Sequence, residues 1–524
     1  MPDAMSAEAG QRTRPSSRLI YPSVNDVAER TVRTRSRRGL LKISLITEGT
    51  YPVHDGGVSV WCDQIVRGMA PDRFHIDAIT VGDDDRYVWT LPDNVTGVRR
   101  VPLWTLESRR RPALGRRVAA STIAALDSLV HAIATNDRDG EFLASLEQLY
   151  RSGGDGQLAH LLKRNSTVEF TLGSMRATVP TGRTPIGLPA PTIADATKVL
   201  GLLEHLLRPL SVAPTRSQLC HATSNGVSAL LAMAAKWEYG TPFLMTEHGI
   251  YLRERYIENS PHSMPHHQRT FLLGFYKQLT TAAYRMADAI APVCDYNRRW
   301  EQANGADLDK IELIHNGIDS DEFSSSATEP DAPTLVWVGR IDPLKDVKTL
   351  LRAFALVKAA MPGSILRIFG GTPIGNEYYL AECLELHAQL DLGGSAVFEG
   401  RVRPIADAYL KGHAVVATSI SEGFPYAVLE AMASGRATIA TDVGGVREAI
   451  GETGVLVPPQ DDDALAHACL DLLRNPARRA RLASAARERA ESLFPVDLCL
   501  ARYGELYDDL VDAGVKSSIR GGIA

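Results

Sequence analysis

Short runs of apolar, β-branched residues recur along the chain and alternate with helical patterns. The first run covers residues 41–47, and a turn, a helical pattern over 59–69 and a second run over 74–81 follow it. These runs are almost continuously apolar, which is typical of parallel strands that are buried on both faces. The spacing of strand, helix and strand therefore predicts βαβ units and a parallel sheet.

The strand pattern occurs in two sets, which a polar connection after Asp319 separates. The first set continues with strands expected at 98–103, 219–223, 242–246, 289–293 and 311–315. The second set is expected at 334–339, 364–369, 396–399, 413–418, 437–441 and 454–457. The predicted fold class is α/β, with two Rossmann-like, doubly wound domains. Because open α/β sheets bind ligands at the carboxyl ends of their strands, the two domains should face a common ligand-binding cleft.

The two sets of strands also define the expected domains. Residues from 105 to about 215 interrupt the first set with helices and loops rich in Gly and Pro, so we expect a helical insertion there, with a role in acceptor or partner contact. The predicted division is a disordered tail at 1–38, a first domain at 39–318, a second domain at 319–490 and a C-terminal helical segment at 491–524.

Composition excludes several classes of function. The chain has 57 Lys and Arg against 62 Asp and Glu, a net charge of -5, whereas a general nucleic-acid binder is usually strongly basic. Its six cysteines are scattered without any C-x-x-C spacing, which argues against a zinc site or a disulfide framework and fits a reducing, cytoplasmic compartment. Because no apolar run reaches 18 residues, we expect no transmembrane helix. The eight Arg of the tail leave a peripheral contact with anionic lipid open.

The most informative stretch is residues 421–435, which follow an expected strand. Pro425 suits the start of a helix and Gly435 its C-terminal cap, so Glu422 should lie in the strand-to-helix loop and Glu430 inside the helix. A helix N-terminus offers free backbone N–H groups and the positive end of a dipole. The stretch therefore suits a sugar–phosphate ligand.

At these residues the chain resembles retaining glycosyltransferase family 4. The family's signature is similar to Glu422-x7-Glu430, followed by Gly435 and residues 441–448. Three further segments resemble the family's phosphate-binding segment, the strand end beside its nucleotide base and its interdomain connection: residues 338–346, 399–402 and 314–319. The resemblance implies the GT-B fold, in which two Rossmann-like domains face a donor cleft and the chain end returns to the first domain.

Segments of the first domain narrow the resemblance. Residues 45–52, 55–61 and 246–255 look like the PelF branch, whose enzymes make the Pel exopolysaccharide from UDP-sugars in the cytosol. The expected insertion also suits that branch. The resemblance implies a UDP-sugar donor, a glycan or lipid-linked acceptor and a membrane polysaccharide synthase as a partner. No motif indicates which sugar is moved.

The resemblance also implies roles for the candidate catalytic residues. Arg340 and Lys345 would meet the negative charge that develops on the diphosphate when its bond to C1 of the sugar breaks. Glu430 would bind the ribose hydroxyls. Glu422 would lie beside the donor sugar, as a nucleophile, a stabiliser or a positioning group. His248 would contact the hydroxyls or the reacting face of that sugar.

Further residues complete the expected donor and acceptor sites. Gly56 and Gly57 stand between a strand and a helix, where the backbone can approach the diphosphate or the sugar closely. Donor contacts are also expected at Arg401, Val402, Gly423 and Phe424, and acceptor-side contacts at Arg253, Glu254 and Arg255.

Two acidic runs, residues 83–85 and 461–463, suggest metal-binding carboxylates. We interpret both as solvated acids, because Arg340 and Lys345 supply cations to balance a diphosphate, and we expect no metal and no other cofactor. Two alternatives stay open: a nucleotide-sugar epimerase of the same fold, and a catalytically silent nucleotide-binding partner of a membrane synthase. A glycan phosphorylase would need a pyridoxal phosphate lysine, and the sequence has no convincing one.

Overall fold

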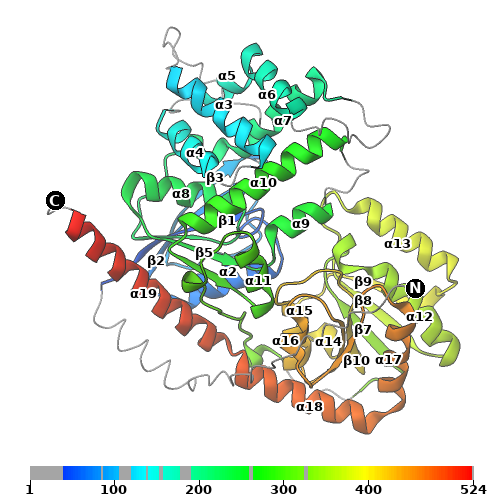
Figure 1. Ribbon diagram of the computed structural model, residues 1–524. Helices are drawn as coiled ribbons and strands as arrows, with labels where there is room; N and C mark the ends of the chain where they lie inside the picture. Colours follow the sequence, from blue (N-terminus) through cyan, green and yellow to red (C-terminus); the bar gives the residue numbers. More distant parts are fainter. Residues whose placement is uncertain are drawn as a thin grey trace, which may run out of the picture.

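The computed structural model contains two parallel six-stranded sheets with helices on both faces (Figure 1). It describes residues 39–83, 86–105, 120–136, 140–152, 157–177, 190–258, 264–323 and 329–521, with side chains up to residue 515. The strand orders are β3-β2-β1-β4-β5-β6 and β12-β11-β10-β7-β8-β9. In both sheets the chain starts near the middle, builds one side and then returns to build the other. The doubly wound prediction is therefore confirmed.

The strands of the first sheet are β1 (Lys42–Glu48), β2 (Arg73–Thr80), β3 (Val95–Pro102), β4 (Leu219–Ala222), β5 (Phe243–Glu247) and β6 (Ala289–Pro292). Successive side chains of β1 point to opposite faces, as in any strand. Ile43 and Leu45 pack in one apolar cluster with α2 (Gly57–Gly68) and α19 (Val496–Gly521). Ile46 packs in another cluster with α8 (Ser228–Tyr239) and α10 (His266–Met286). This alternation buries both faces of the sheet.

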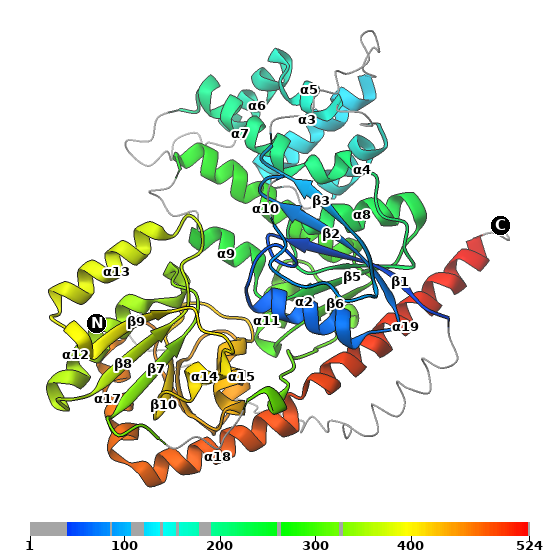
Figure 2. The same ribbon diagram turned by 180° about the vertical axis from the view of Figure 1, so that it is seen from behind.

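The second sheet follows the same principle. Its strands are β7 (Thr334–Val338), β8 (Ile365–Phe369), β9 (Ala396–Gly400), β10 (Ala414–Ala417), β11 (Ala437–Thr441) and β12 (Val455–Val457). One face packs against α12 (Val347–Ala360), α13 (Glu377–Gln389) and α17 (Asp462–Arg474). The other packs against α15 (Tyr426–Ala433), α16 (Val446–Ile450) and α18 (Pro476–Leu493). Figure 2 shows the two sheets side by side from the opposite direction.

The expected strand at 311–315 is wrong. Ile311 forms one isolated bridge with Ile290, and the N–H groups of Glu312 and Ile314 donate to carbonyls along β6. The segment is extended beside β6 for these contacts only, because the chain then leaves the sheet for the second domain. Its apolar composition resembles a strand, but no ladder forms.

Among the described residues, five α-helices lie between β3 and β4 in the first domain. They are α3 (Ala120–Thr135), α4 (Glu141–Ser152), α5 (Gln157–Leu162), α6 (Asn165–Ala177) and α7 (Ile193–Leu206). Leu129, Leu146 and Leu203 join the same apolar cluster as Phe275 of α10. Figure 1 shows these helices at the end of the molecule opposite α18. The helices of the insertion thus share a core with the first sheet.

The C-terminal helix α19 returns to the first domain. Its side chains Tyr503 and Tyr507 are completely buried against α2 and the first sheet. Tyr507 shares a 2.8 Å hydrogen bond with Nδ1 of His221, whose Nε2 lies 2.8 Å from the hydroxyl of Thr246. The chain thus crosses between the domains twice, and Ile318 and Pro495 of the two crossings form a parallel bridge.

The buried histidine of this network predicts a pH-dependent stability. Burial lowers the pKa of His221 to about 3, whereas an unfolded histidine titrates near pH ~6.5. The unfolded chain therefore binds more protons between these values, so His221 contributes fully above about pH 6.5 and its contribution decreases below that. We expect His221 to account for about 2 kcal/mol of stability lost between pH 7.5 and about pH 5.

Denaturant unfolding at both pH values measures this effect. The His221→Gln variant should show a smaller loss on acidification than the wild type, whereas His467→Gln, at an exposed position, should match the wild type. Equal pH dependence in His221→Gln and the wild type would contradict the assignment.

Candidate active site

The carboxyl ends of the two sheets face each other. A Cβ added at Gly57, at the start of α2, would lie 3.4 Å from Cδ2 of Tyr426, the first residue of α15. The Tyr426 hydroxyl donates to Oε1 of Gln64 at 2.8 Å, which joins α15 to α2. A Cβ added at Gly56 would lie 4.0 Å from Nη1 of Arg340. Residues predicted on separate domains are thus brought to one interface.

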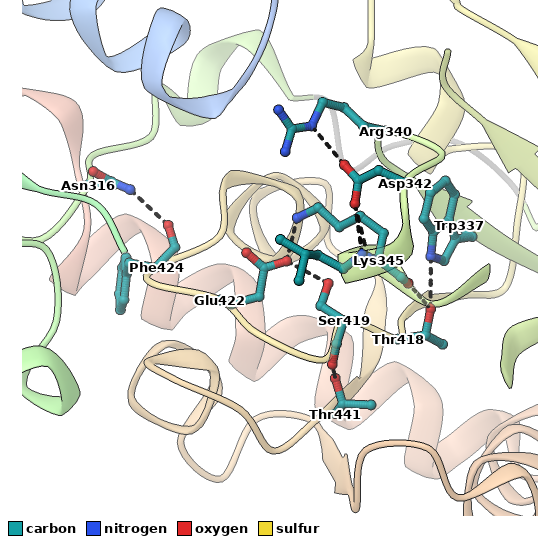
Figure 3. A network of polar contacts seen from close by, with 11 residues as sticks. Asn316, Trp337, Arg340, Asp342, Lys345, Thr418, Ser419, Glu422, Phe424 and Thr441 are labelled. Atoms are coloured by element: carbon teal, nitrogen blue, oxygen red, sulfur yellow. Dashed lines mark hydrogen bonds and ion pairs between the residues drawn. The ribbon is translucent and has the colours of Figure 1, made fainter. Parts of the chain in front are cut away.

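The loop before α15 lies directly against the first domain. A Cβ added at Gly423 would lie 1.5 Å from the carbonyl oxygen of His248, so the two backbones are in direct contact. The carbonyl oxygen of Gly423 accepts from Gly445 N at 2.8 Å. The side-chain amide of Asn316 donates to the Phe424 carbonyl at 2.8 Å (Figure 3). Only glycine fits at 423 without moving one domain away from the other.

We expect Gly423→Ala to destabilise the protein by about 1–3 kcal/mol, the usual cost of inserting atoms into a packed region. The added methyl group must displace the His248 backbone, which β5 holds in place. Gly394→Ala is a matched control because a Cβ there would meet nothing within 4 Å. Thermal unfolding of both variants measures the difference, and identical melting would contradict this tight contact.

A cation and a carboxylate form the centre of the interface on the second domain. Nζ of Lys345 donates to Oε1 of Glu422, and Oγ of Ser419 donates to the same oxygen (Figure 3). The side chains of Lys345 and Glu422 are 22% and 14% exposed, so the pair is largely but not fully shielded from water. Across the described part of the chain, no donor reaches Oε2 of Glu422. One oxygen is therefore held and the other is available to a ligand.

A short turn after β7 positions the cation. Asp342 caps the 3₁₀ turn Pro343–Lys345, and its Oδ1 accepts from Lys345 N at 3.2 Å. The Lys345 carbonyl accepts a hydrogen bond from the Thr418 hydroxyl at 2.8 Å. The same hydroxyl accepts from Trp337 Nε1 at 3.2 Å (Figure 3). Arg340 lies 3.2 Å from Asp342 and is 54% exposed. The backbone of Lys345 is thus held at both its N–H and its carbonyl group, and the Arg340 guanidinium stays accessible near Gly56.

The second predicted glutamate lies on α15. Oε2 of Glu430 accepts a hydrogen bond from the hydroxyl of Tyr409, which ends α14 (Ala406–Tyr409). Burial raises the pKa of the Glu430 carboxyl, and the hydrogen bond from Tyr409 acts in the opposite direction. The spacing in the sequence found Glu430 but gave no sign of its partner.

His248 directly follows β5, as expected from the sequence. Its ring makes an edge contact with Trp61, with 4.7 Å between the ring centroids. Burial lowers the pKa of His248 to about 3, so the imidazole is neutral near pH ~7. Its Nε2 is buried and lacks a hydrogen-bond partner among the described residues. A neutral ring with a free nitrogen can contact a hydroxyl but cannot act as a cation.

The predicted acceptor-side residues lie on α9 (Tyr251–Glu258), directly after the His248 loop. The guanidinium of Arg255 stacks over the Tyr251 ring at 4.9 Å. A Cβ added at Gly249 would lie 2.3 Å from Oε1 of Glu254, so this carboxylate packs against the loop. Arg253 is half-buried on the same helix. The helix holds the three residues beside His248.

Two ion pairs between the domains, both made by Asp55, were not predicted. Asp55, which precedes Gly56, lies 2.8 Å from Arg401 and 3.2 Å from Arg403. Val402, which lies between these two arginines and was predicted to contact the donor, packs against an apolar cluster formed by Val336, Phe369 and Ala408. Asp55 is the first residue of the segment 55–61 that we identified, but its partner Arg401 is 346 residues away, so local sequence gave no sign of the contact.

Two residues of the second acidic run have structural contacts. Asp461 caps α17 by accepting from Ala464 N at 2.8 Å, and Asp462 pairs with Arg352 at 2.6 Å. Asp84 and Asp85 lie outside the described residues. Within the described ranges, no three or more His, Cys, Asp or Glu side chains form a group that could hold a metal ion.

All six cysteines are buried free thiols. A search of the described helices finds none that has both the length and the apolar character needed to cross a membrane.

Two facing doubly wound sheets, with a last helix that returns to the first, define the GT-B class of fold. Solved structures with this arrangement include sucrose-phosphate synthase from Thermosynechococcus elongatus, at a TM-score of 0.61 and 20% identity over 90% of this chain and 100% of that one. Anabaena HepE in complex with UDP matches at a TM-score of 0.57 and 16% identity, over 90% of this chain and 100% of that one. The predicted GT-B fold is confirmed.

The chain belongs to the family described as "Domain of unknown function (DUF3492)", which matches residues 41–309. Residues 332–475 match the family "Glycosyl transferases group 1". A D-inositol 3-phosphate glycosyltransferase from Rhodococcus opacus is 36% identical over 203 residues, 36% of this chain and 46% of that protein. One from Streptomyces scabiei is 32% identical over 234 residues, 41% of this chain and 52% of that protein. The chain spans about half the length of these curated relatives.

Proposed function

We propose that this protein is a retaining glycosyltransferase that moves a hexose-type sugar from a UDP-sugar to a glycan or lipid-linked acceptor. The observation that carries the proposal is the Lys345–Glu422 pair at the carboxyl edge of the second sheet, opposite Gly56 and Gly57. A cation beside a carboxylate suits a substrate that releases an anionic diphosphate from an electron-poor sugar carbon. The glycosyl transferases group 1 match over residues 332–475 supports the same class of reaction.

The proposed leaving-group site consists of fixed positive groups. Lys345 is held by the turn after β7, and Arg340 is accessible beside it. The first N–H groups of α15 have no partner within the helix, as at every helix N-terminus. Because these groups are fixed before the reaction, they stabilise the developing diphosphate charge without reorganising. Under this proposal the enzyme uses no divalent metal.

The proposed sugar and ribose contacts come from both domains. The free Oε2 of Glu422 would accept from a hydroxyl of the donor sugar, and the neutral ring of His248 would approach that sugar from the first domain. Glu430 would accept from the ribose hydroxyls, for which a carboxylate offers two acceptor atoms. Structures of HepE with UDP, and with UDP and glucose, support a nucleotide sugar as the ligand of this fold.

We further propose that the protein has a PelF-like role: it would take part in the synthesis of an exopolysaccharide in the cytosol, with a membrane polysaccharide synthase as partner. Its support is the resemblance at residues 45–52, 55–61 and 246–255. Under this proposal α9 and the insertion helices α3 to α7 contact a glycan or that partner.

A screen of nucleotide sugars by thermal shift, followed by turnover with the ligands found, tests the proposed function. A ligand that binds only the folded protein raises stability by about 2.7 kcal/mol at roughly a hundred times its Kd. UDP-sugars should stabilise the protein and be consumed only when an acceptor is present. Conversion of the sugar without an acceptor would indicate an epimerase instead, and binding without any turnover would indicate a silent partner.

A further inference from the structure

The contact between Tyr409 and Glu430 restrains one oxygen of a buried carboxylate. Tyr409 is completely buried, and its ring lies 6.2 Å from Phe323 between ring centroids. Its hydroxyl donates to Oε2 of Glu430, a carboxylate on the neighbouring helix. Within the described residues, no hydrogen-bond donor reaches Oε1 of Glu430. The tyrosine therefore fixes one carboxylate oxygen and leaves the other free.

The same arrangement occurs at Glu422. There the hydroxyl of Ser419 and the ammonium of Lys345 both donate to Oε1, and Oε2 is left for a ligand. A carboxylate held at one oxygen can rotate little, so its other oxygen keeps a defined position. Such fixed acceptors discriminate between ligands that carry a matching hydroxyl and ligands that lack it.

We propose that Tyr409 is a positioning residue that orients Glu430 to accept hydrogen bonds from the ribose hydroxyls of the donor. This inference rests on the proposed function and extends it to a residue that never touches the ligand. Burial also favours the protonated form of Glu430, and a protonated carboxyl would be a poorer acceptor. The Tyr409 hydroxyl opposes that effect, and because burial raises the pKa of Tyr409 itself, the hydroxyl stays protonated and continues to donate.

Calorimetry with UDP and 2′,3′-dideoxy-UDP tests the inference. The ratio of the two Kd values isolates the ribose hydroxyls, because both nucleotides carry the same base and diphosphate. The wild type should favour UDP, and Tyr409→Phe should reduce that preference by about tenfold, the usual effect of one hydrogen bond to a charged group. At saturating UDP-sugar, kcat should remain near the wild-type value while KM rises. Tyr378→Phe, at a 56% exposed position, is the matched control and should change neither.

A double variant separates positioning from a general structural role. In a Glu430→Gln background, Tyr409→Phe should add little further loss, because the carboxylate that it orients is already gone. An unchanged preference in Tyr409→Phe, or an equal loss in both backgrounds, would overturn the inference alone. A wild-type protein that binds neither nucleotide would overturn the proposed function and this inference with it.

Discussion

Replacing Lys345 with Ala should lower turnover by about 100- to 1,000-fold, the usual cost of removing one fixed group that stabilises developing charge. The ammonium contacts Glu422 in the free protein and is 22% exposed, so it is shielded from bulk water. Weak screening makes its interaction with a diphosphate stronger than that of a surface lysine. Steady-state turnover with a UDP-sugar and an acceptor measures the effect.

Lys348→Ala is the control for this variant. Lys348 lies on α12 and pairs with Glu382 at 2.7 Å at the surface, so its removal should leave turnover near the wild-type value. EDTA should also leave wild-type turnover nearly unchanged. If EDTA abolishes turnover and Mn²⁺ restores it, while Lys345→Ala is nearly neutral, the proposed leaving-group site is wrong.

Glu422→Gln should reduce kcat by about 100-fold or more, since it removes a preorganised charge beside the reacting carbon. The amide has nearly the same shape, so Ser419 can still bond to the oxygen at this position. The neutral amide of the variant cannot balance positive charge on the sugar, as the Glu422 carboxylate can. UDP affinity should stay the same or increase, because Lys345 no longer has a competing carboxylate. Activity assays together with UDP calorimetry measure both quantities.

The exposed Glu385 provides a matched control, because it bonds only to Gln389 on its own helix at 3.2 Å in the described structure. Glu385→Gln should retain full turnover. A Glu422→Gln variant with more than half of the wild-type turnover would show that the carboxylate has no part in the reaction.

The strands could be predicted from sequence because burial on both faces leaves a local signature. β7 (Thr334–Val338) and β11 (Ala437–Thr441) are short apolar runs, and their bounds lie within one residue of the expected ones. Residues 311–315 carry the same signature but form one isolated bridge. Whether such a run pairs with a neighbouring strand depends on the course of the chain after it. Local composition carries no information about that course.

Some features of the site could likewise be predicted from local sequence, and others could not. Glu422 and Glu430 follow from a spacing within one loop and one helix. Contacts between distant segments do not: Tyr409 is 21 residues from Glu430, and Asp55 is 346 residues from Arg401. The first contact exists because α14 and α15 pack side by side, and the second because the two domains face each other. A single sequence shows the residues of this site more readily than the residues that position them.

The most direct test of the account is transfer itself, measured in the presence of EDTA. The protein is incubated with a UDP-sugar found by thermal shift and a glycan acceptor, while UDP release and the anomeric protons are followed by NMR. We expect UDP release that depends on the acceptor, and a product with the same anomeric configuration as the donor. Absence of binding across the nucleotide-sugar panel, or a product of inverted configuration, would contradict it.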